Sequence, residues 1–362
     1  MTDKVDVLVV GSGPAGSVAA RYAAMSGASV KIVERRPEVG VPVRCGEFMP
    51  SIEEIKNMFP NATDLETLFD IPDNLRCLQT HGIRLIDPKD KVTTLELEGY
   101  TTDRDRFDKY LAGLATEAGA EISFNDSFRQ ISNGIAETDK GETEYKVIIG
   151  ADGPGSRVGQ SLGLRGNRNP YPAVTVQVKG EFEPYMKMFF GGIAPGAYGW
   201  IIPKDGRANV GVGFSPKFAN GDLLTYLDKF MGRNGFKAEG KAYGKYVPSE
   251  GPIPKTVSGN GMVVGDAAGQ VISVNGGGIP RAMIAGRICG TVAGENVSTG
   301  RSLEDYETQW RHVMDKPLRT AAFNKKLADT FAFRSDFTTK MCMSILGKRR
   351  MGNLIRCKRI FP

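Results

Sequence analysis

Short, largely apolar runs occur at four separate places along the chain. They cover residues 5–10, 30–33, 144–149 and 261–264. Runs of this length, bounded by glycines or charged residues, are typical of strands buried on both faces of a sheet. A glycine-rich turn and a segment of helical length separate the first two runs. We therefore predict an α/β domain whose strands are scattered along the sequence.

A different pattern fills the intervals between these runs. Residues 76–97 and 173–214 look like shorter strands separated by turns, which indicates a second sheet. Within residues 221–235, apolar side chains recur at helical spacing and predict one helix over that sheet. These side chains are Leu223, Leu224, Leu227, Phe230 and Met231. We assign residues 76–97 and 171–254 to an inserted domain built on an antiparallel sheet.

Helical patterns occur in two further segments. Apolar residues at Phe107, Leu111, Leu114 and Ala115 predict a helix that Thr102 or Asp103 can cap. Near the end of the chain, residues 303–342 are expected to be helical, with Pro317 as a break. Residues 301–362 therefore form a helical C-terminal region in this prediction.

The turn after the first apolar run has the spacing of a dinucleotide-binding motif, Gly11-Ser12-Gly13-Pro14-Ala15-Gly16. Gly11 permits a tight turn, Gly13 lets the backbone approach a pyrophosphate, and Gly16 lets the helix pack closely on the strand. Amide N–H groups at the helix N-terminus then face the phosphates. Glu34 ends the second run, and its carboxylate suits the two hydroxyls of an adenosine ribose and repels a 2′-phosphate. This pattern favours FAD or NAD over NADP.

Composition limits the class of protein. The 362 residues predict two domains, and the hydrophobic fraction of 41% is that of a soluble globular protein. The sequence has no apolar run long enough to span a bilayer, and its N-terminus goes directly into the first strand, so we expect a cytoplasmic protein. With five cysteines, no CxxC spacing and two histidines, we expect free thiols and no metal.

The net charge of +6 is concentrated at the C-terminus. Residues 337–362 contain Lys and Arg but no Asp or Glu, interleaved with apolar side chains. Such a mixture favours contact with an anionic membrane surface. A terminal helix that is solvated or packed against the protein is the alternative. Nucleic acid is not expected as a partner, because the segment has few aromatic residues for stacking.

Three linked motifs resemble those of the FAD flavoproteins related to p-hydroxybenzoate hydroxylase. They are the first glycine turn with Glu34, the strand end at Asp152, and the strand end at Asp266. The resemblance implies a discontinuous Rossmann domain of the glutathione-reductase type, built from residues 1–75, 98–170 and 255–300, that binds FAD. In that family the second acid holds a ribityl hydroxyl. The backbone of Gly276, Gly277, Gly278 and Ile279 then approaches the flavin ring, and Arg35 and Arg104 lie near the cofactor.

A sharper resemblance is carried by Cys45-Gly46-Glu47 and by the segment Tyr198-Gly199-Trp200-Ile201-Ile202-Pro203-Lys204. Together with the Arg-Asp-x-Phe-Asp pattern at 104–108, they are similar to the motifs of the geranylgeranyl reductase family. Its archaeal members saturate the prenyl chains of membrane ether lipids. Two departures are Ser273-Val274-Asn275, where the family often has proline and threonine, and Phe48, where glycine is frequent.

The resemblance implies hydride transfer from reduced FAD to an isolated alkene of a prenylated lipid such as digeranylgeranylglycerophospholipid. Such an alkene offers no polar handle, so a dry, apolar channel must place it against the flavin. Tyr198 and Trp200 point to one face of their strand and are expected to line that channel. Cys45 is either a proton source or a wall, and Glu47 holds a proton if burial raises its pKa.

Two other functions remain open from the sequence. The Tyr-x-Trp-x-Ile-Pro segment is one residue from a motif of flavin halogenases, which allows a monooxygenase or halogenase. A flavin-binding electron-transfer or assembly subunit that docks by its basic tail is the third possibility. Because no second dinucleotide motif follows a strand, electrons must come from an external donor: NADPH, a deazaflavin or ferredoxin.

Overall fold

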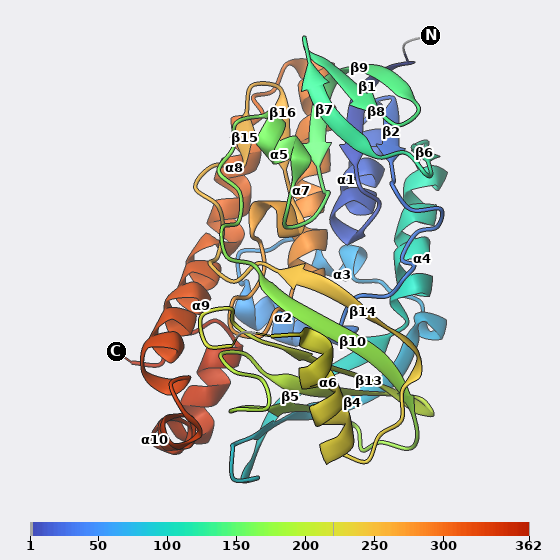
Figure 1. The fold of residues 1–362 in the computed structure, drawn as a ribbon. Helices are drawn as coiled ribbons and strands as arrows, with labels where there is room; N and C mark the ends of the chain where they lie inside the picture. The colour runs from blue at the N-terminus through green and yellow to red at the C-terminus, as the bar shows by residue number, and fades with distance from the viewer. Residues whose placement is uncertain (1–2, 220, 362) are drawn as a thin grey trace.

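The computed structural model describes residues 3–219 and 221–361. Two eight-stranded sheets form the upper and lower parts of the molecule, and the C-terminal helices run along one side of both (Figure 1). We call the upper sheet, which contains the first apolar run, sheet 1 and the lower one sheet 2.

Sheet 1 has the order β15-β16-β9-β1-β2-β6, with the hairpin β7-β8 attached to β9. Strands β16, β9, β1, β2 and β6 are parallel to their neighbours, and β15 adds an antiparallel edge. The strands are β1 (Asp3–Val10), β2 (Val30–Val33), β6 (Glu121–Ser123), β7 (Phe128–Ser132), β8 (Ile135–Thr138), β9 (Gly141–Gly150), β15 (Val257–Ser258) and β16 (Gly261–Val263). All four apolar runs are therefore strands of one sheet, as the pattern predicted.

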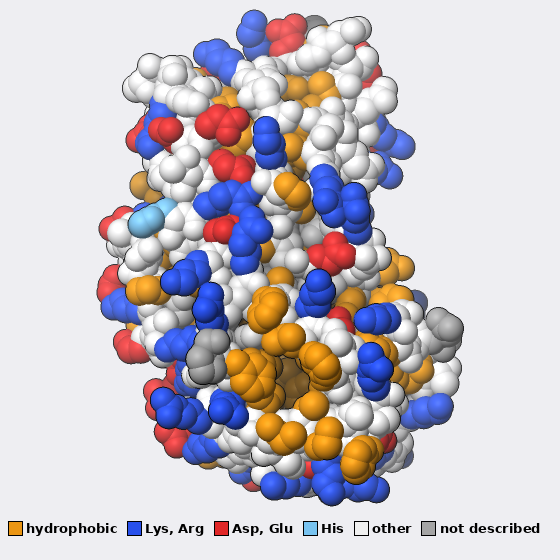
Figure 2. Space-filling model, turned by 90° about the vertical axis from the view of Figure 1, so that its left-hand side faces the viewer, with side chains coloured by type: hydrophobic (Ala, Val, Ile, Leu, Met, Phe, Trp, Pro, Cys, Tyr) orange, Lys and Arg blue, Asp and Glu red, His pale blue; other side chains and the backbone are white. Residues whose placement is uncertain are grey.

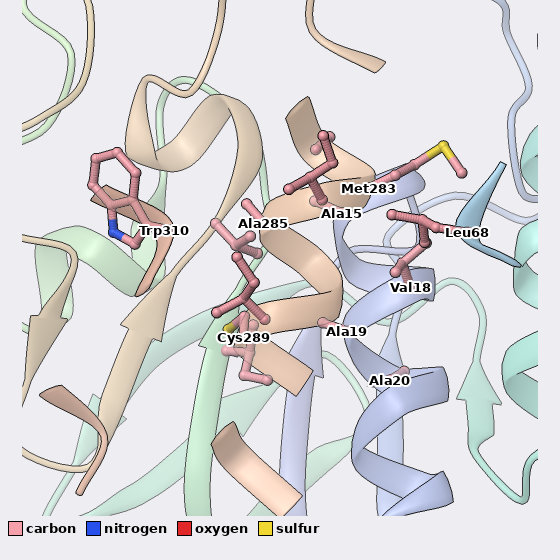
Figure 3. Close-up of a cluster of buried hydrophobic side chains, with 14 of the residues drawn as sticks. Ala15, Val18, Ala19, Ala20, Leu68, Met283, Ala285, Cys289 and Trp310 are labelled. Carbon is pink, nitrogen blue, oxygen red and sulfur yellow. The ribbon is translucent and has the colours of Figure 1, made fainter. Parts of the chain in front are cut away.

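Helices α1 (Pro14–Met25) and α7 (Ile279–Thr299) pack closely against each other beside sheet 1 (Figure 3). Small residues make this approach possible: a Cβ added at Gly290 would lie 2.1 Å from the backbone oxygen of Ala19. Other elements of this half are α2 (Ile52–Met58), α3 (Leu65–Leu68), the 3-10 turn η1 (Asp73–Leu75), α4 (Arg104–Glu117), α5 (Arg157–Ser161) and η2 (Gly265–Ala268). The tight contact places the N-termini of α1 and α7 on the same side of the molecule as the strand ends.

Sheet 2 has the order β14-β10-β13-β12-β11-β4-β5-β3 and is antiparallel except where β11 pairs with β4. Its strands are β3 (Phe48–Pro50), β4 (Arg76–Ile86), β5 (Val92–Thr102), β10 (Tyr171–Lys179), β11 (Tyr185–Phe189), β12 (Gly199–Lys204), β13 (Arg207–Gly213) and β14 (Glu239–Val247). The predicted helix, α6 (Leu223–Arg233), buries Leu227, Phe230 and Met231 against it. A second apolar cluster joins β4, β5 and β11 to Met351 and Ile355 of the C-terminal region.

The C-terminal helices differ from the prediction in two ways: the chain does not break at Pro317, and the helical segment does not end at residue 342. The chain stays helical through α8 (Glu304–Trp310), the π turn η3 (Arg311–Asp315), α9 (Lys316–Leu327) and the π turn η4 (Ala328–Ala332). Pro317 lies in the first turn of α9, directly after a π turn, so it causes no break. Helix α10 (Asp336–Ile355) then continues beyond residue 342, with a kink at Gly347. Within the described residues, no helix is long and apolar enough to cross a bilayer.

Candidate active site

A cavity of about 1150 Å³ is lined by residues of both sheets and of the C-terminal helices. Every residue that the sequence singled out for a site lines it, except Gly16. A Cβ at Gly16 would lie 1.9 Å from the backbone oxygen of Gly11, so Gly16 serves the close packing of the turn on itself. Ligand pockets are typically about 300–1,000 Å³. This cavity is therefore large enough for a cofactor and a second ligand.

The first glycine turn presents an uncapped helix N-terminus to the cavity. Helix α1 begins after Gly13 without a side-chain cap and without an acid in its first turn. A Cβ added at Gly13 would meet nothing within 4 Å, so there is free space in front of the turn. Unsatisfied N–H groups at a helix start attract anions. The turn is thus suited to a phosphate group.

Glu34 accepts three hydrogen bonds, two of them from the first glycine turn. Its Oε2 accepts from the Ser12 amide at 2.9 Å and from the Ser12 hydroxyl at 2.7 Å, and its Oε1 accepts from the Arg36 amide at 3.0 Å. A carboxylate has about four acceptor positions. The contacts inside the protein therefore leave room for about one further donor, fewer than the two ribose hydroxyls that the sequence suggested.

Two other acids mark the strand ends at the cavity. Asp152 accepts from the amides of Arg157 and Val158 through Oδ2, whereas its buried Oδ1 has no hydrogen-bond partner. Burial raises the pKa of Asp152. Asp266 pairs with Lys245 of β14 at 2.6 Å. Burial opposes the charge of Lys245, but the nearby Asp266 carboxylate outweighs it and raises the Lys245 pKa.

Glu47 is the centre of a buried polar cluster. Its Oε1 accepts from Lys204 Nζ at 2.9 Å and from the Arg104 amide at 3.1 Å, and its Oε2 accepts from Gln177 and Asn209, both at 2.9 Å. Four donors, one of them a cation, occupy the four acceptor positions of the carboxylate. These contacts fix Glu47, and with it the Cys-Gly-Glu segment, against sheet 2; its role as a proton carrier stays a prediction.

The same cluster corrects the predicted cap of helix α4. The hydroxyl of Thr102 donates to the Leu75 carbonyl, and the Asp103 carboxylate pairs with Lys204 at 2.5 Å. Neither side chain caps the helix, because both are used elsewhere. Glu47, distant in sequence, receives the first amide of the helix in their place.

Asn209 of β13 connects the Cys-Gly-Glu segment to Trp200. Its amide nitrogen donates to the Cys45 carbonyl and to Glu47, both at 2.9 Å, while its oxygen accepts from Trp200 Nε1 at 2.8 Å. The indole lies over Gly211, where an added Cβ would come within 2.2 Å of the ring. Trp200 is thus held at its N–H and along its face.

Tyr198 links sheet 2 to the second glycine turn. Its hydroxyl donates to the backbone oxygen of Asn275, and its ring packs edge-on against Trp200 with centroids 5.9 Å apart. Burial raises the pKa of Tyr198. The phenol is therefore neutral. It lines the cavity and joins β12 to the second glycine turn.

Arg104 lies against Cys45. Its guanidinium forms a two-pronged pair with Asp108, with both N–O distances 2.8 Å. Burial disfavours its charge, but Asp108 and the neighbouring Cys45 thiol outweigh burial and raise the Arg104 pKa. The Cys45 sulfur accepts from the Glu47 amide at 3.3 Å and lines the cavity.

Sequence reasoning missed four residues of this site: Gln177, Asn209, Lys245 and Arg281. They come from β10, β13, β14 and the start of α7. No local motif marks the first three, because a polar residue inside a strand pattern is ordinarily solvent-facing. Arg281 follows the glycine turn directly, so its position near the site was detectable, although its burial was not.

Comparison with known proteins places these features in a family. Residues 6–132 match the family described as FAD dependent oxidoreductase, and residues 171–246 match the geranylgeranyl reductase catalytic domain. A digeranylgeranylglycerophospholipid reductase of Methanocaldococcus jannaschii is 35% identical over 346 residues, which cover 86% of this chain and 83% of that protein.

Solved structures agree with this assignment. A geranylgeranyl bacteriochlorophyll reductase-like protein of Thermoplasma acidophilum superimposes with a TM-score of 0.84 at 29% identity, covering 95% of this chain and 92% of that one. A flavin-dependent brominase, 18% identical with a TM-score of 0.71 and coverage of 98% and 94%, shares the fold. The chain therefore belongs to the geranylgeranyl reductase family of FAD-dependent oxidoreductases.

Proposed function

We propose that this protein saturates the isoprenoid double bonds of geranylgeranyl chains in archaeal-type ether lipid precursors, most directly digeranylgeranylglycerophospholipid. One observation carries the proposal: a single cavity joins the uncapped turn after β1 to the Tyr198–Trp200 wall of β12. Relatives of that name, at 35% identity over most of the chain, support it. The substrate and the cofactor then meet inside one cavity.

The proposal assigns different tasks to the two sheets. Sheet 1 is the core of a Rossmann domain of the glutathione-reductase type, formed by residues 1–75, 98–170 and 255–300. Residues 76–97 and 171–254 form the substrate domain, and residues 301–362 cover the cavity from one side. The parallel order of sheet 1, with the glycine turn after its central strand β1, supports this division.

The residues present fit FAD. The start of α1 offers free N–H groups and space for a pyrophosphate, and the start of α7 at Gly278 is also uncapped. The unpartnered Asp152 Oδ1 offers an acceptor for a hydroxyl of the ligand. We propose that Glu34, Asp266 and residues 276–279 complete the site. Bound and reduced, FAD supplies a hydride to one carbon of the alkene.

The chain itself must hold the alkene, exclude water and deliver a proton to the second carbon. Ile83, Leu97, Met186, Met188 and Phe190 give the cavity an apolar wall beside Trp200. We assign the proton to the Cys45 thiol, which lines the same cavity and whose backbone carbonyl accepts from Asn209. Phe48, a departure from the family pattern, also lines the cavity.

Trp200→Ala is expected to reduce prenyl turnover at least about tenfold while FAD content stays unchanged. The indole fills the wall and is held by Asn209 and Gly211, so its loss lets the alkene leave the reactive position. Steady-state turnover and the flavin-to-protein ratio measure both effects. Trp200→Phe, which keeps a ring but loses the N–H, should retain more activity. Wild-type turnover in Trp200→Ala would remove this residue from the substrate channel.

We further propose that the lipid enters from a membrane surface. The face that carries α9 and α10 shows a hollow rimmed by hydrophobic side chains, with Lys and Arg around it (Figure 2). In α10, Phe337, Met341 and Ile345 form an exposed stripe, with exposed fractions of 73%, 43% and 61%. The end of the basic tail is packed instead, since Met351 and Ile355 are buried. In this proposal the exposed stripe of α10 meets the membrane, while the end of the tail packs against the protein.

Changing Phe337, Met341 and Ile345 together to serine is expected to weaken binding to phosphatidylglycerol vesicles at least about tenfold. Burying each such side chain contributes about 1.5–3 kcal/mol, and the neighbouring cations add attraction to the anionic surface. Vesicle sedimentation at low salt measures the change. Met25→Ser with Val92→Ser, which alters exposed apolar residues outside α10, is the matched control. Equal binding by both variants would refute docking through α10.

The function itself is tested with the reduced protein under nitrogen. Digeranylgeranylglycerophospholipid should reoxidise the flavin, whereas the fully saturated lipid should not. The electron donor is proposed to be external, NADPH, a reduced deazaflavin or ferredoxin, because the sequence has one dinucleotide motif. A flavin that stays reduced until oxygen is admitted would favour a monooxygenase.

A further inference from the structure

Arg281 is a buried cation without a counter-charge. It lies in the first turn of α7, is 2% exposed and lines the cavity. Its Nη1 has no hydrogen-bond partner, and no carboxylate among residues 3–219 and 221–361 forms an ion pair with it. Its acidic neighbour is Cys357, whose pKa burial raises to about 12, so that thiol is neutral. The positive charge of Arg281 is therefore unbalanced inside the protein.

Arg36 and Arg44 also line the cavity without an ion pair to any described residue, but both are partly exposed, and three further cations there are paired. Arg104 pairs with Asp108, Lys245 with Asp266, and Lys325 with Asp329. Leaving a buried charge unpaired costs several kcal/mol, and a buried cation without a partner ordinarily loses its charge or its burial. Burial lowers the pKa of Arg281 to about 10, which still leaves the guanidinium charged at neutral pH. An anion supplied by a ligand would remove the imbalance.

The guanidinium lies against the second glycine turn. Its Nε donates to the Gly277 carbonyl at 3.1 Å, and a Cβ added at Gly277 would come within 2.7 Å of Nη2. The ring of Phe59 covers it, with the guanidinium carbon 5.6 Å from the ring centroid. The charge is thus fixed directly beneath the turn that, in the proposed function, meets the flavin. It adds to the positive end of α7, which is uncapped.

We propose that Arg281 balances the negative charge that the flavin ring gains on reduction, and so raises the reduction potential of the bound FAD. This inference rests on the proposed FAD site. Reduction by two electrons with uptake of one proton leaves the ring with one negative charge, which a fixed cation in a dry site stabilises. The oxidised ring is neutral, so the cation stabilises it less than the reduced ring. The cation therefore shifts the equilibrium toward the reduced form.

The phosphate of the lipid is the other anion that this protein would meet. The placement favours the flavin, because Arg281 is bonded to the turn itself and is shielded by Phe59. A headgroup phosphate would have to leave water completely to reach a side chain that is 2% exposed. The experiment therefore includes both anions.

The test compares FAD-loaded wild type with Arg281→Met and Arg281→Lys by anaerobic redox titration against a reference dye. Arg281→Met should shift the equilibrium at least about tenfold toward oxidised flavin, about 30 mV more negative for a two-electron couple. Arg281→Lys keeps the charge and should stay near wild type. Arg287→Met is the control, because Arg287 lies on the same helix but pairs with Asp64 at 2.6 Å. Its potential should not change.

Thermal unfolding of the FAD-free variants separates the proposed role of Arg281 from a purely structural one. A structural role predicts a lower melting temperature for Arg281→Met than for wild type. Arg281→Met should be as stable as wild type or more stable, because it removes an unpaired buried charge. A lower melting temperature together with an unchanged flavin potential would show that Arg281 is a packing residue and overturn the inference.

Lipid binding to the oxidised holoprotein, followed by flavin fluorescence, distinguishes the two anions. Affinity for digeranylgeranylglycerophospholipid should be the same in Arg281→Met and wild type. Lost lipid affinity with an unchanged potential would assign Arg281 to the phosphate and overturn the inference. Wild-type protein that binds no FAD would refute the proposed function itself, and the inference with it.

Discussion

Replacing Glu47 by glutamine is expected to lower the free energy of unfolding by about 3–5 kcal/mol and to abolish most prenyl turnover. Glu47 and Lys204 are 1% and 2% exposed, and their charges face each other at 2.9 Å. Glutamine has the same shape, so the change removes the charge without creating a cavity. Glutamine also replaces one acceptor oxygen by an N–H₂ group, which then faces side chains that donate and need an acceptor.

The destabilisation follows from the number of donors that depend on this carboxylate. Lys204 retains Asp103, but Gln177, Asn209 and the Arg104 amide lose a charged acceptor. Hydrogen bonds to charged groups contribute about 1.5–3 kcal/mol each, and a donor left buried without a partner costs a similar amount. Loss of turnover follows because the Glu47 carboxylate holds Asn209, whose amide nitrogen also donates to the Cys45 carbonyl.

Urea unfolding followed by circular dichroism measures the stability. Glu144→Gln is the matched control: Glu144 pairs with Lys4 at 3.3 Å on the surface, where the two side chains are 49% and 79% exposed. Exposed pairs contribute about 0–1 kcal/mol, so this variant should resemble wild type. Equal stability of the two variants would contradict the role given to Glu47.

Glu34→Arg is expected to weaken FAD binding at least about a hundredfold, or about 2.7 kcal/mol. Arginine has no acceptor for the Ser12 amide, the Ser12 hydroxyl or the Arg36 amide, so the turn loses its support. The larger cation also occupies the space that the proposed ribose needs.

Flavin absorbance after gel filtration, followed by titration with added FAD, measures the loss. Glu38→Arg changes an exposed residue that lies four positions further along the chain and pairs with Lys109, and it should bind FAD normally. Glu34→Gln keeps one acceptor oxygen and should fall between wild type and Glu34→Arg. A normal flavin content in Glu34→Arg would refute the assignment of this acid.

The sequence predicted those parts of the fold that depend on local rules. Residues 5–10 and 30–33 are parallel strands in register, and the helix after Gly13 begins at Pro14, because apolar runs and glycine spacing determine both. The helix predicted within 221–235 is α6. The family was also recognisable from short motifs, and the comparisons confirm it.

What the sequence could not supply is the set of contacts between distant segments. Glu47 meets Gln177, Lys204 and Asn209 across 130 to 162 positions in sequence, and no periodicity encodes that meeting. Its role as a proton carrier was implied by the family resemblance on the condition that burial raises its pKa, and it stays a prediction. Pro317 was misjudged for a related reason, since a preceding π turn lets the helical path continue.

The central claim is that reduced flavin saturates a prenyl alkene held in the same cavity. It is tested most directly by the mass of the lipid after a single anaerobic turnover in D₂O. The N–H hydrogens of a reduced flavin and the S–H hydrogen of Cys45 both exchange with solvent, so each saturated bond should gain one deuterium from each and no oxygen. A lipid of unchanged mass, or one that gains oxygen once air is admitted, would contradict the account.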